Sequence, residues 1–219
     1  MINFIRTAKP MIGIGCRAKL QSSQRSNESA MKQANDKPSG FDRNSVPILW
    51  RRIPTPLGPM IGAANNDALV LLEFADRRAL EKQRRAVCRR FQGELIPGDN
   101  HVLKQAEQEL SEYFSGSRTR FDVPLNVPGT VFQSKIWNEL RAIAAGETKT
   151  YSELARNIDK PDAVRAVGRA NSDNRIAIMI PCHRVIGADG KLTGYAGGLW
   201  RKRKLLDLEQ GQLELEMPT

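Results

Sequence analysis

The chain has 219 residues and a formal net charge of +10. That length is enough to bury a sizeable core, and no apolar run approaches the about 20 residues that a membrane-spanning helix needs. The three cysteines, Cys16, Cys88 and Cys182, show no paired spacing, which excludes a disulfide framework and favours a reducing compartment. With only His101 and His183 as imidazole ligands, we expect no metal and no cofactor.

Half of the excess charge lies at the N-terminus. Residues 1–46 carry eight Lys/Arg against three Asp/Glu, and the remainder carries 26 against 21. The polar, basic composition of residues 1–45 predicts a disordered leader. This composition is also found in transit peptides. A misassigned translation start, with Met31 as one candidate for the true start, explains the leader equally well. We expect the moderately basic body to suit a polyanion, in the cytoplasm at the nucleoid.

Residues 46–127 predict an α/β domain. Turn-rich stretches at 54–59 and 65–67 separate three apolar runs, a pattern typical of a three-stranded antiparallel meander. Apolar residues then recur at helical spacing twice. In chain order the pattern predicts strands at 48–53, 60–64 and 68–74 and helices at 77–91 and 101–114. A proline-punctuated extended segment follows, and we place the domain boundary at its end.

Residues 128–212 predict a mostly helical second domain, followed by a tail at 213–219. One helix starts near Thr130, a second spans 152–157, and a third runs from about 160 to 171. The short turn between the last two predicts a helix-turn-helix of winged-helix type. Small residues cover the third helix, and Arg165 and Arg169 share one of its faces. This pattern fits a helix pressed against a nucleic-acid backbone and a solvated arginine pair equally well.

A candidate reactive thiol follows the apolar run 176–180. Pro181 restricts the backbone and presents Cys182 in a defined direction, with His183 directly behind it. The alternative is a strand that ends in a tight turn with a buried, inert cysteine. The residues of this run alone leave both interpretations open.

The second domain closely resembles the catalytic domain of O6-alkylguanine-DNA alkyltransferases, also called methylated-DNA-protein-cysteine methyltransferases. The run Pro181-Cys182-His183-Arg184-Val185 is the acceptor signature of that family. The similarity extends to Phe132-Gln133, Tyr151 to Ala155, Ala163 to Asn171, Gly194 to Gly198, Arg201-Lys202 and, upstream, Thr55 to Pro59. The resemblance therefore covers nearly everything from Ile48 onward.

The resemblance implies a catalytic set. Cys182 is the acceptor and His183 its base, acting through a water because neighbouring side chains on an extended segment point apart. Glu209 in the terminal helix orients the imidazole. Tyr151 is the candidate donor to guanine N3, which protonates or hydrogen-bonds the leaving group, and Asn174 holds the turn that positions the thiol.

The resemblance also implies substrate and DNA contacts. The carbonyl groups of Cys182 and Val185 read the guanine amino group, Tyr195 shapes the pocket wall, and the Ala196 amide bonds O6. Arg165 is the finger that fills the gap left by the flipped nucleotide. The remaining DNA contacts that we expect are Arg169, Ala163, Ala166, Ala170 and Lys202.

The implied activity is direct reversal of DNA damage. An alkyl group moves irreversibly, once per protein molecule, from O6-alkylguanine, and from O4-methylthymine, in flipped-out nucleotides of double-stranded DNA to Cys182. We expect a monomer with no obligate protein partner. Two rivals stay open: a damage-binding protein that flags the lesion without repairing it, which would lack the thiol, and a cysteine hydrolase that turns over. The chain lacks the four-cysteine module of relatives that activate transcription.

Overall fold

The structure, a computed structural model, describes residues 47–212 and residue 215. The predicted leader, 1–45, lies outside the described residues, as does all of the predicted tail except Leu215. The described residues belong to one compact unit. The predicted boundary at residue 127 therefore stays a prediction.

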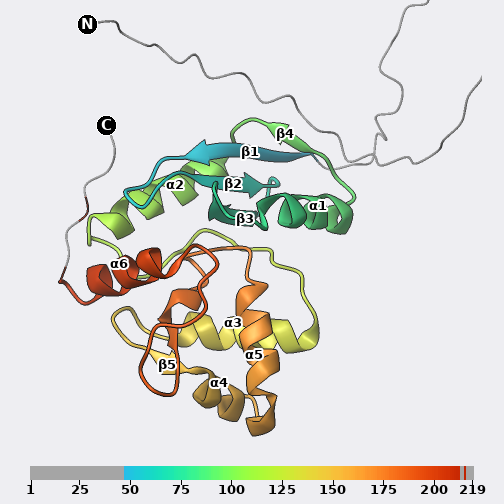
Figure 1. The fold of residues 1–219 in the computed structure, drawn as a ribbon. Helices are drawn as coiled ribbons and strands as arrows, with labels where there is room; N and C mark the ends of the chain where they lie inside the picture. The colour runs from blue at the N-terminus through green and yellow to red at the C-terminus, as the bar shows by residue number, and fades with distance from the viewer. Residues whose placement is uncertain (1–46, 213–214, 216–219) are drawn as a thin grey trace, which may run out of the picture. The chain divides into compact units, whose positions relative to one another are not determined.

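The first half contains the predicted meander. Strands β1 (Ile48–Ile53), β2 (Met60–Ala64) and β3 (Leu69–Phe74) pair antiparallel in sequence, and β3 is buried along its whole length (Figure 1). A fourth strand that the sequence did not predict, β4 (Leu95–Pro97), pairs parallel with β1. The sheet is thus mixed, in the order β3-β2-β1-β4.

Helices α1 (Leu80–Phe91) and α2 (His101–Phe114) both contact the sheet. Val87 of α1 belongs to one hydrophobic cluster with Ile61 and Val70, whereas Leu103 and Leu110 of α2 join the main core. Successive strand residues point to opposite faces, so the two helices cover different faces of the sheet. Helix α1 begins three residues later than predicted, because residues 75–79 form turns.

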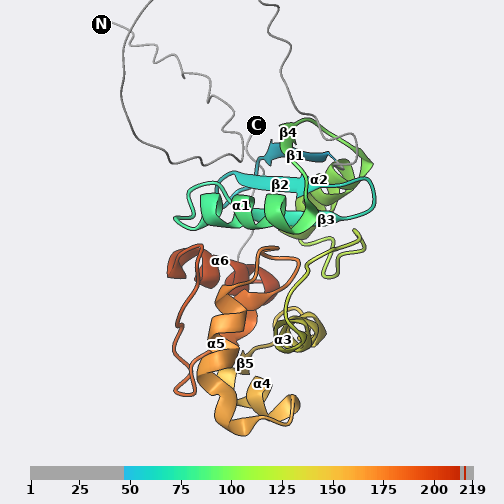
Figure 2. The same ribbon diagram turned by 90° about the vertical axis from the view of Figure 1, so that its right-hand side faces the viewer.

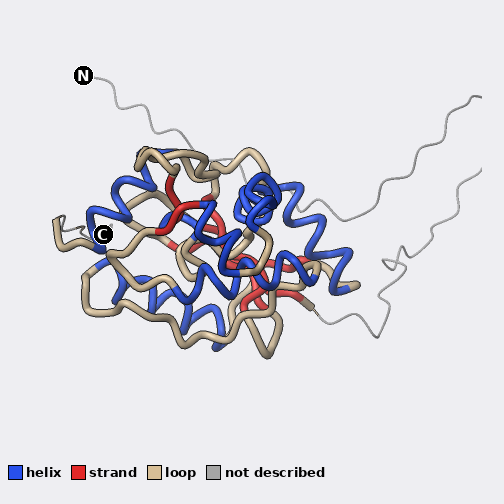
Figure 3. Tube along the Cα trace, turned by 90° about the horizontal axis from the view of Figure 1, so that it is seen from below, coloured by secondary structure: helices blue, strands red, loops and turns tan. Residues whose placement is uncertain are grey.

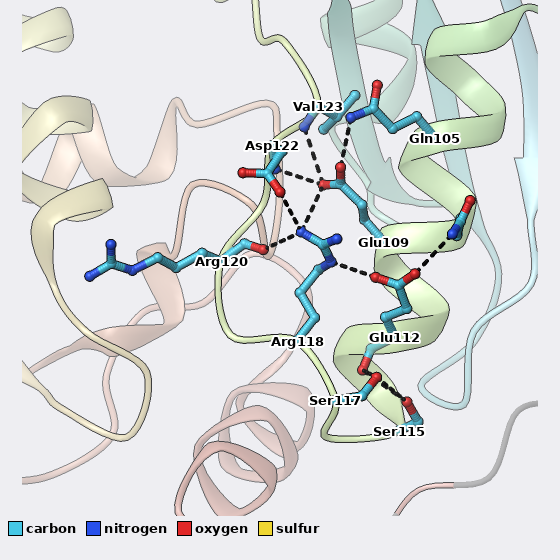
Figure 4. Close-up of polar contacts among 10 residues, drawn as sticks. Gln105, Glu109, Glu112, Ser115, Ser117, Arg118, Arg120, Asp122 and Val123 are labelled. Atoms are coloured by element: carbon cyan, nitrogen blue, oxygen red, sulfur yellow. Dashed lines mark hydrogen bonds and ion pairs between the residues drawn. The ribbon is translucent and has the colours of Figure 1, made fainter.

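A polar network holds the end of α2 against the linker that follows. The guanidinium of Arg118 donates to the carboxylates of Glu112 and Asp122, at 2.7 and 2.8 Å (Figure 4). Buried Glu109 accepts hydrogen bonds from the backbone amides of Asp122 and Val123, at 2.9 and 3.2 Å. The linker is therefore anchored at the point where it leaves the first half of the chain.

Two segments from later in the chain run along β3. The amide of Leu69 donates to Pro124 O of the linker at 2.8 Å, and the amide of Leu72 donates to Arg175 O at 2.9 Å. In turn, the amide of Ala177 donates to Leu72 O at 2.7 Å. The edge of the sheet is thereby paired rather than exposed, and it ties the sheet to the segment that carries the thiol.

The second half is mostly helical (Figures 2 and 3). Helices α3 (Val131–Ala142) and α4 (Tyr151–Asn157) each begin with a capping box, in which Thr130 pairs with Gln133 and Thr150 with Glu153. The 3-10 turn η1 (Pro161–Ala163) leads into α5 (Val164–Ser172), which packs on α3 and α4. Helices α4 and α5 form the predicted helix-turn-helix.

The chain ends around a two-stranded parallel ladder. Strand β5 (Lys149–Thr150) pairs with β6 (Val185–Ile186), which follows the 3-10 turn η2 (Cys182–Arg184). A loop then leads to α6 (Leu199–Glu209). Among the described residues, no helix is long and apolar enough to cross a membrane.

Candidate active site

The apolar run before the thiol is not a strand. Only Ile176 makes a ladder contact, with Leu72. Met179 N donates to Ala177 O at 2.9 Å around Ile178, whose φ is +72°, and such a three-residue turn with positive φ is strained, above all for a β-branched residue. A second three-residue turn, centred on Pro181, closes with Cys182 N donating to Ile180 O at 2.8 Å. Burial against the sheet, rather than ladder pairing, explains the apolar run.

Asn174 holds these turns together. Its Oδ1 accepts from Ile176 N at 3.0 Å, and its Nδ2 donates to Ile180 O at 2.9 Å. The same Nδ2 lies 3.2 Å from the Sγ atom of Cys182. Asn174 is buried and contacts both the turn and the thiol, and its positioning role stays a prediction.

The thiol is buried and protonated at neutral pH. Cys182 is 8% exposed and lies at the start of η2. Burial raises the pKa of its thiol to about 11, against the hydrogen bond from Asn174. A thiol with so high a pKa needs a base to become nucleophilic.

His183 and Glu209 form a buried hydrogen-bonded pair. His183 Nε2 lies 2.8 Å from Glu209 Oε1. Burial alone would raise the pKa of Glu209, but hydrogen bonds and charge from His183 and Arg184 outweigh it and hold that pKa below its ordinary value. Burial lowers the pKa of His183, although Glu209 opposes this. An ionised carboxylate only accepts, so the neutral imidazole carries its proton on Nε2.

That tautomer leaves the other ring nitrogen able to accept a proton. His183 Nδ1 is buried and makes no hydrogen bond within the described part of the chain. The residues Cys182 and His183 lie in a 3-10 turn rather than the extended segment that we expected. Three residues make one turn of such a helix, so neighbouring side chains still point apart, and the predicted water between them stays a prediction.

Glu209 is held by more than His183. Arg184 donates to both carboxylate oxygens, from Nε at 2.9 Å and from Nη2 at 2.8 Å, and Tyr113 Oη donates at 2.8 Å. No role for Arg184 was predicted from the sequence. A charged residue inside a buried apolar stretch indicates an ion pair, and that signal could have identified it.

A small pocket, with a volume of about 10 Å³, opens beside the sulfur. Its wall on one side is the loop with Gly194, Tyr195, Ala196 and Gly197. A Cβ on Gly197 would lie 2.9 Å from the Phe74 ring, so this wall has no room for a larger residue there. The Tyr195 hydroxyl is buried and makes no hydrogen bond within the described residues, and burial raises its pKa well above 10.

Tyr151 and Val185 complete the predicted substrate contacts. Tyr151 opens α4 and is partly buried, and burial raises the pKa of its hydroxyl while hydrogen bonds with Thr193 and Asn171 oppose the shift. The Val185 carbonyl accepts from the ammonium group of Lys202. That carbonyl therefore already accepts one hydrogen bond from within the protein.

The prediction that Lys202 contacts DNA is wrong for this structure. Lys202 is 0% exposed, and its ammonium also donates to Thr193 O at 2.7 Å. Burial lowers its pKa to about 8. Lys202 braces the pocket loop from inside and cannot reach a phosphate.

Helix α5 presents part of the predicted DNA-contacting surface. Arg165, Ala166 and Arg169 are exposed, and Ala163 is half-buried. Ala170, in contrast, is 2% exposed, and its carbonyl accepts from Trp137 Nε1 at 3.0 Å. Ala170 therefore faces α3 rather than a ligand, which corrects its assignment to the DNA-binding surface.

Two charged residues in the pocket wall were not predicted. Glu73 of β3 and Arg77, in the turn after it, form an ion pair and line the thiol pocket. Glu73 interrupts a fully buried strand, which was the available signal. Within the described residues no group of three His, Cys, Asp or Glu is placed to hold a metal ion.

Comparison with known proteins accounts for both halves of the chain. The family model described as 6-O-methylguanine DNA methyltransferase, ribonuclease-like domain, matches residues 48–127, and the one described as the DNA binding domain matches residues 131–211. A methylated-DNA–protein-cysteine methyltransferase of Mycobacterium bovis is 43% identical over 170 residues, covering 78% of this chain and 97% of that relative. One from Methanosarcina barkeri is 46% identical over 165 residues, covering 74% and 96%.

A solved structure shows the same architecture. Mycobacterium tuberculosis OGT in complex with DNA is 42% identical, with a TM-score of 0.65 over 76% of this chain and 95% of that one. A helix-turn-helix beside a buried thiol thus defines the class, a DNA-binding repair methyltransferase. The chain belongs to the methylated-DNA–protein-cysteine methyltransferase family and is an enzyme of that kind. The predicted family and fold class are confirmed.

Proposed function

We propose that the protein repairs double-stranded DNA by one irreversible transfer of an alkyl group from O6-alkylguanine, and from O4-methylthymine, to Cys182. The observation that carries the proposal is the arrangement around the thiol. The sulfur faces a pocket, the neighbouring imidazole has an Nδ1 without a hydrogen bond among the described residues, and Glu209 fixes the opposite nitrogen. This is the order of groups that activates a nucleophile through an oriented base.

Residues of this chain, together with solvent, account for each proton and bond in the transfer. The Cys182 proton passes through a water to His183 Nδ1, and the thiolate attacks the alkyl carbon. A carbon–sulfur bond forms while the carbon–O6 bond breaks, and the electron pair stays on the guanine. Tyr151, which lies near the thiol and keeps its proton because burial raises its pKa, donates a hydrogen bond to N3 and so stabilises the departing guanine anion. The guanine then takes up a proton from solvent, and His183 releases the proton that it accepted. The thioether has no route back, so each molecule acts once.

A buried thiol requires that the damaged base leave the duplex. Cys182 is 8% exposed, and a stacked base cannot reach an atom inside a pocket. Arg165 is exposed on α5 and is suited to occupy the vacated space. Arg169, Ala163 and Ala166 lie on the same short segment and would contact the DNA backbone.

Within the pocket we assign recognition to main-chain groups. The carbonyls of Cys182 and Val185 accept from the guanine amino group, the Ala196 amide donates to O6, and Tyr195 forms the wall. Val185 O is bonded to Lys202, but a carbonyl has two lone pairs and can accept a second bond. We expect the protein to act as a monomer, in the cytoplasm at the nucleoid.

A duplex with a labelled methyl group on guanine O6 tests the proposal. The wild-type protein should carry the label on Cys182, and Cys182→Ser should bind the duplex with unchanged affinity and take no label. Tight binding without label on the wild-type chain would overturn the proposal and favour a damage-binding protein. Released label with many turnovers would favour a hydrolase.

A further inference from the structure

Arg77 connects the first half of the chain to the thiol-bearing half. It lies in the turn that follows β3, and its side chain is 8% exposed. Its guanidinium forms an ion pair with Glu73, whose side chain is 2% exposed. A buried charge pair is weak evidence for stability, because desolvation offsets most of the attraction. Stability alone therefore does not explain why Arg77 is buried here.

The guanidinium reaches two carbonyl groups across the junction. Nη2 donates to Ser172 O at 2.9 Å, and Nη1 donates to Asn174 O at 3.1 Å. Gln83 of α1 donates to the same Asn174 carbonyl at 3.3 Å. Ser172 is the last residue of α5, where a cation is favoured by the helix dipole and by unpaired carbonyls. Arg77 thus binds the end of the helix that presents Arg165.

Asn174 is also the residue that contacts the sulfur. Arg77 holds its main-chain oxygen, while its side-chain Nδ2 donates to Cys182 Sγ at 3.2 Å and to Ile180 O at 2.9 Å. The side-chain direction depends on where the backbone is held. A shift of Asn174 would move the donor away from the thiol and loosen the strained turn around Ile178.

We propose that Arg77, held in place by Glu73, is a positioning residue of the alkyl-transfer step that acts through Asn174. This rests on the proposed function, because it assumes transfer to Cys182. Arg77 and Glu73 both line the thiol pocket, and Arg77 holds the backbone of Asn174, so we expect their main effect on the transfer step. The first half of the chain therefore contributes to the chemistry through Arg77, in addition to Tyr113, which donates to Glu209.

Substitutions of Arg77 separate positioning from folding. Arg77→Met removes both cross-junction bonds, and Arg77→Lys keeps the charge and can restore one of them. The double variant Glu73→Gln/Arg77→Met avoids an uncompensated buried carboxylate. Arg51→Met is the matched control, because Arg51 also forms ion pairs from the sheet, with Asp99 and Glu107, away from the thiol.

The readouts are duplex affinity, the single-turnover transfer rate at saturating duplex, and thermal melting. We expect Arg77→Met and the double variant to transfer about tenfold to 100-fold more slowly, as loss of hydrogen bonds from a charged donor implies. Arg77→Lys should recover part of the rate, Arg51→Met should equal wild type, and affinities should stay within about threefold, since the altered interaction acts on the transfer step.

A double-mutant cycle with Asn174→Ala tests the route. If Arg77 acts through Asn174, adding Arg77→Met to Asn174→Ala should slow transfer no further. The inference would be overturned if the rate losses of Arg77→Met and Asn174→Ala multiplied in the double variant. It would also be overturned if Arg77→Met transferred as fast as Arg51→Met, or if Arg77→Met weakened only the affinity for duplex. Absence of transfer by the wild-type protein would instead overturn the proposed function itself.

Discussion

The change Glu209→Gln is the most informative single substitution at the site. It keeps the size of the side chain and removes one acceptor and the negative charge. Oε1 of Glu209 accepts from Tyr113, His183 and Arg184, and Oε2 accepts from Arg184 Nε and Gly146 N, the last at 3.3 Å. An amide nitrogen in either place faces only donors, so at least two hydrogen bonds are lost whichever way the amide turns.

Both stability and rate should fall. Arg184, 6% exposed, loses its carboxylate partner, and removing one member of a buried ion pair costs about 3–5 kcal/mol of unfolding free energy. The amide can also donate to His183 Nε2, which moves the imidazole proton to Nδ1 and removes the acceptor for the Cys182 proton. We expect transfer to slow about 100-fold or more, as for loss of a general base.

Single-turnover transfer from a methylated duplex, with urea unfolding in parallel, measures both effects. Asp207→Asn is the control, because Asp207 lies on α6 and its side chain makes no hydrogen bond within the described residues. The DNA affinity of Glu209→Gln should match that of the control. A folded Glu209→Gln protein that transfers within about threefold of wild type would refute the role of the oriented imidazole, since that role predicts a far larger loss.

Three further outcomes are expected. Arg165→Ala should slow repair of duplex far more than reaction with free alkylguanine base, and equal losses would count against a finger that stabilises the flipped state. Because burial raises the pKa of Cys182 to about 11, its alkylation by a small neutral reagent, without DNA, should rise about tenfold per pH unit above neutrality; a plateau near pH 8.5, the pKa of an ordinary thiol, would contradict the buried state. Lys202→Met should lower the unfolding free energy by about 1–3 kcal/mol, because the carbonyls of Val185, which is buried, and of Thr193 lose their donor; an unchanged denaturation midpoint would contradict its bracing role.

Local pattern was sufficient for most of the fold. Turn residues separated the strands of the meander, and apolar spacing located the helices. Strand β4 was missed because it has three residues, ends in proline, and depends on parallel pairing with β1. The run at 176–180 stayed open between a strand and a braced loop, because an apolar stretch looks the same in a buried strand and in buried turns. Its turns close through Asn174, a contact that no local pattern encodes.

The site residues likewise divide into those that the sequence predicts and those that it does not. Cys182 and His183 lie in one short motif, and the contact with Glu209 followed from the family resemblance. Lys202 was assigned to the DNA surface through the family resemblance, yet 202, 205, 206 and 209 share a helical face, and Leu205 and Leu206 are buried. Arg77 was out of reach, since its partners lie 95 and 97 residues away in sequence.

The most direct test of the central claim is a count of methyl groups transferred per protein molecule with O6-methylguanine duplex in excess. The account predicts that the reaction stops at one methyl per chain, and that peptide mapping finds the added group on Cys182 alone. Continued turnover past one equivalent, or a methyl group on any other residue, would contradict it.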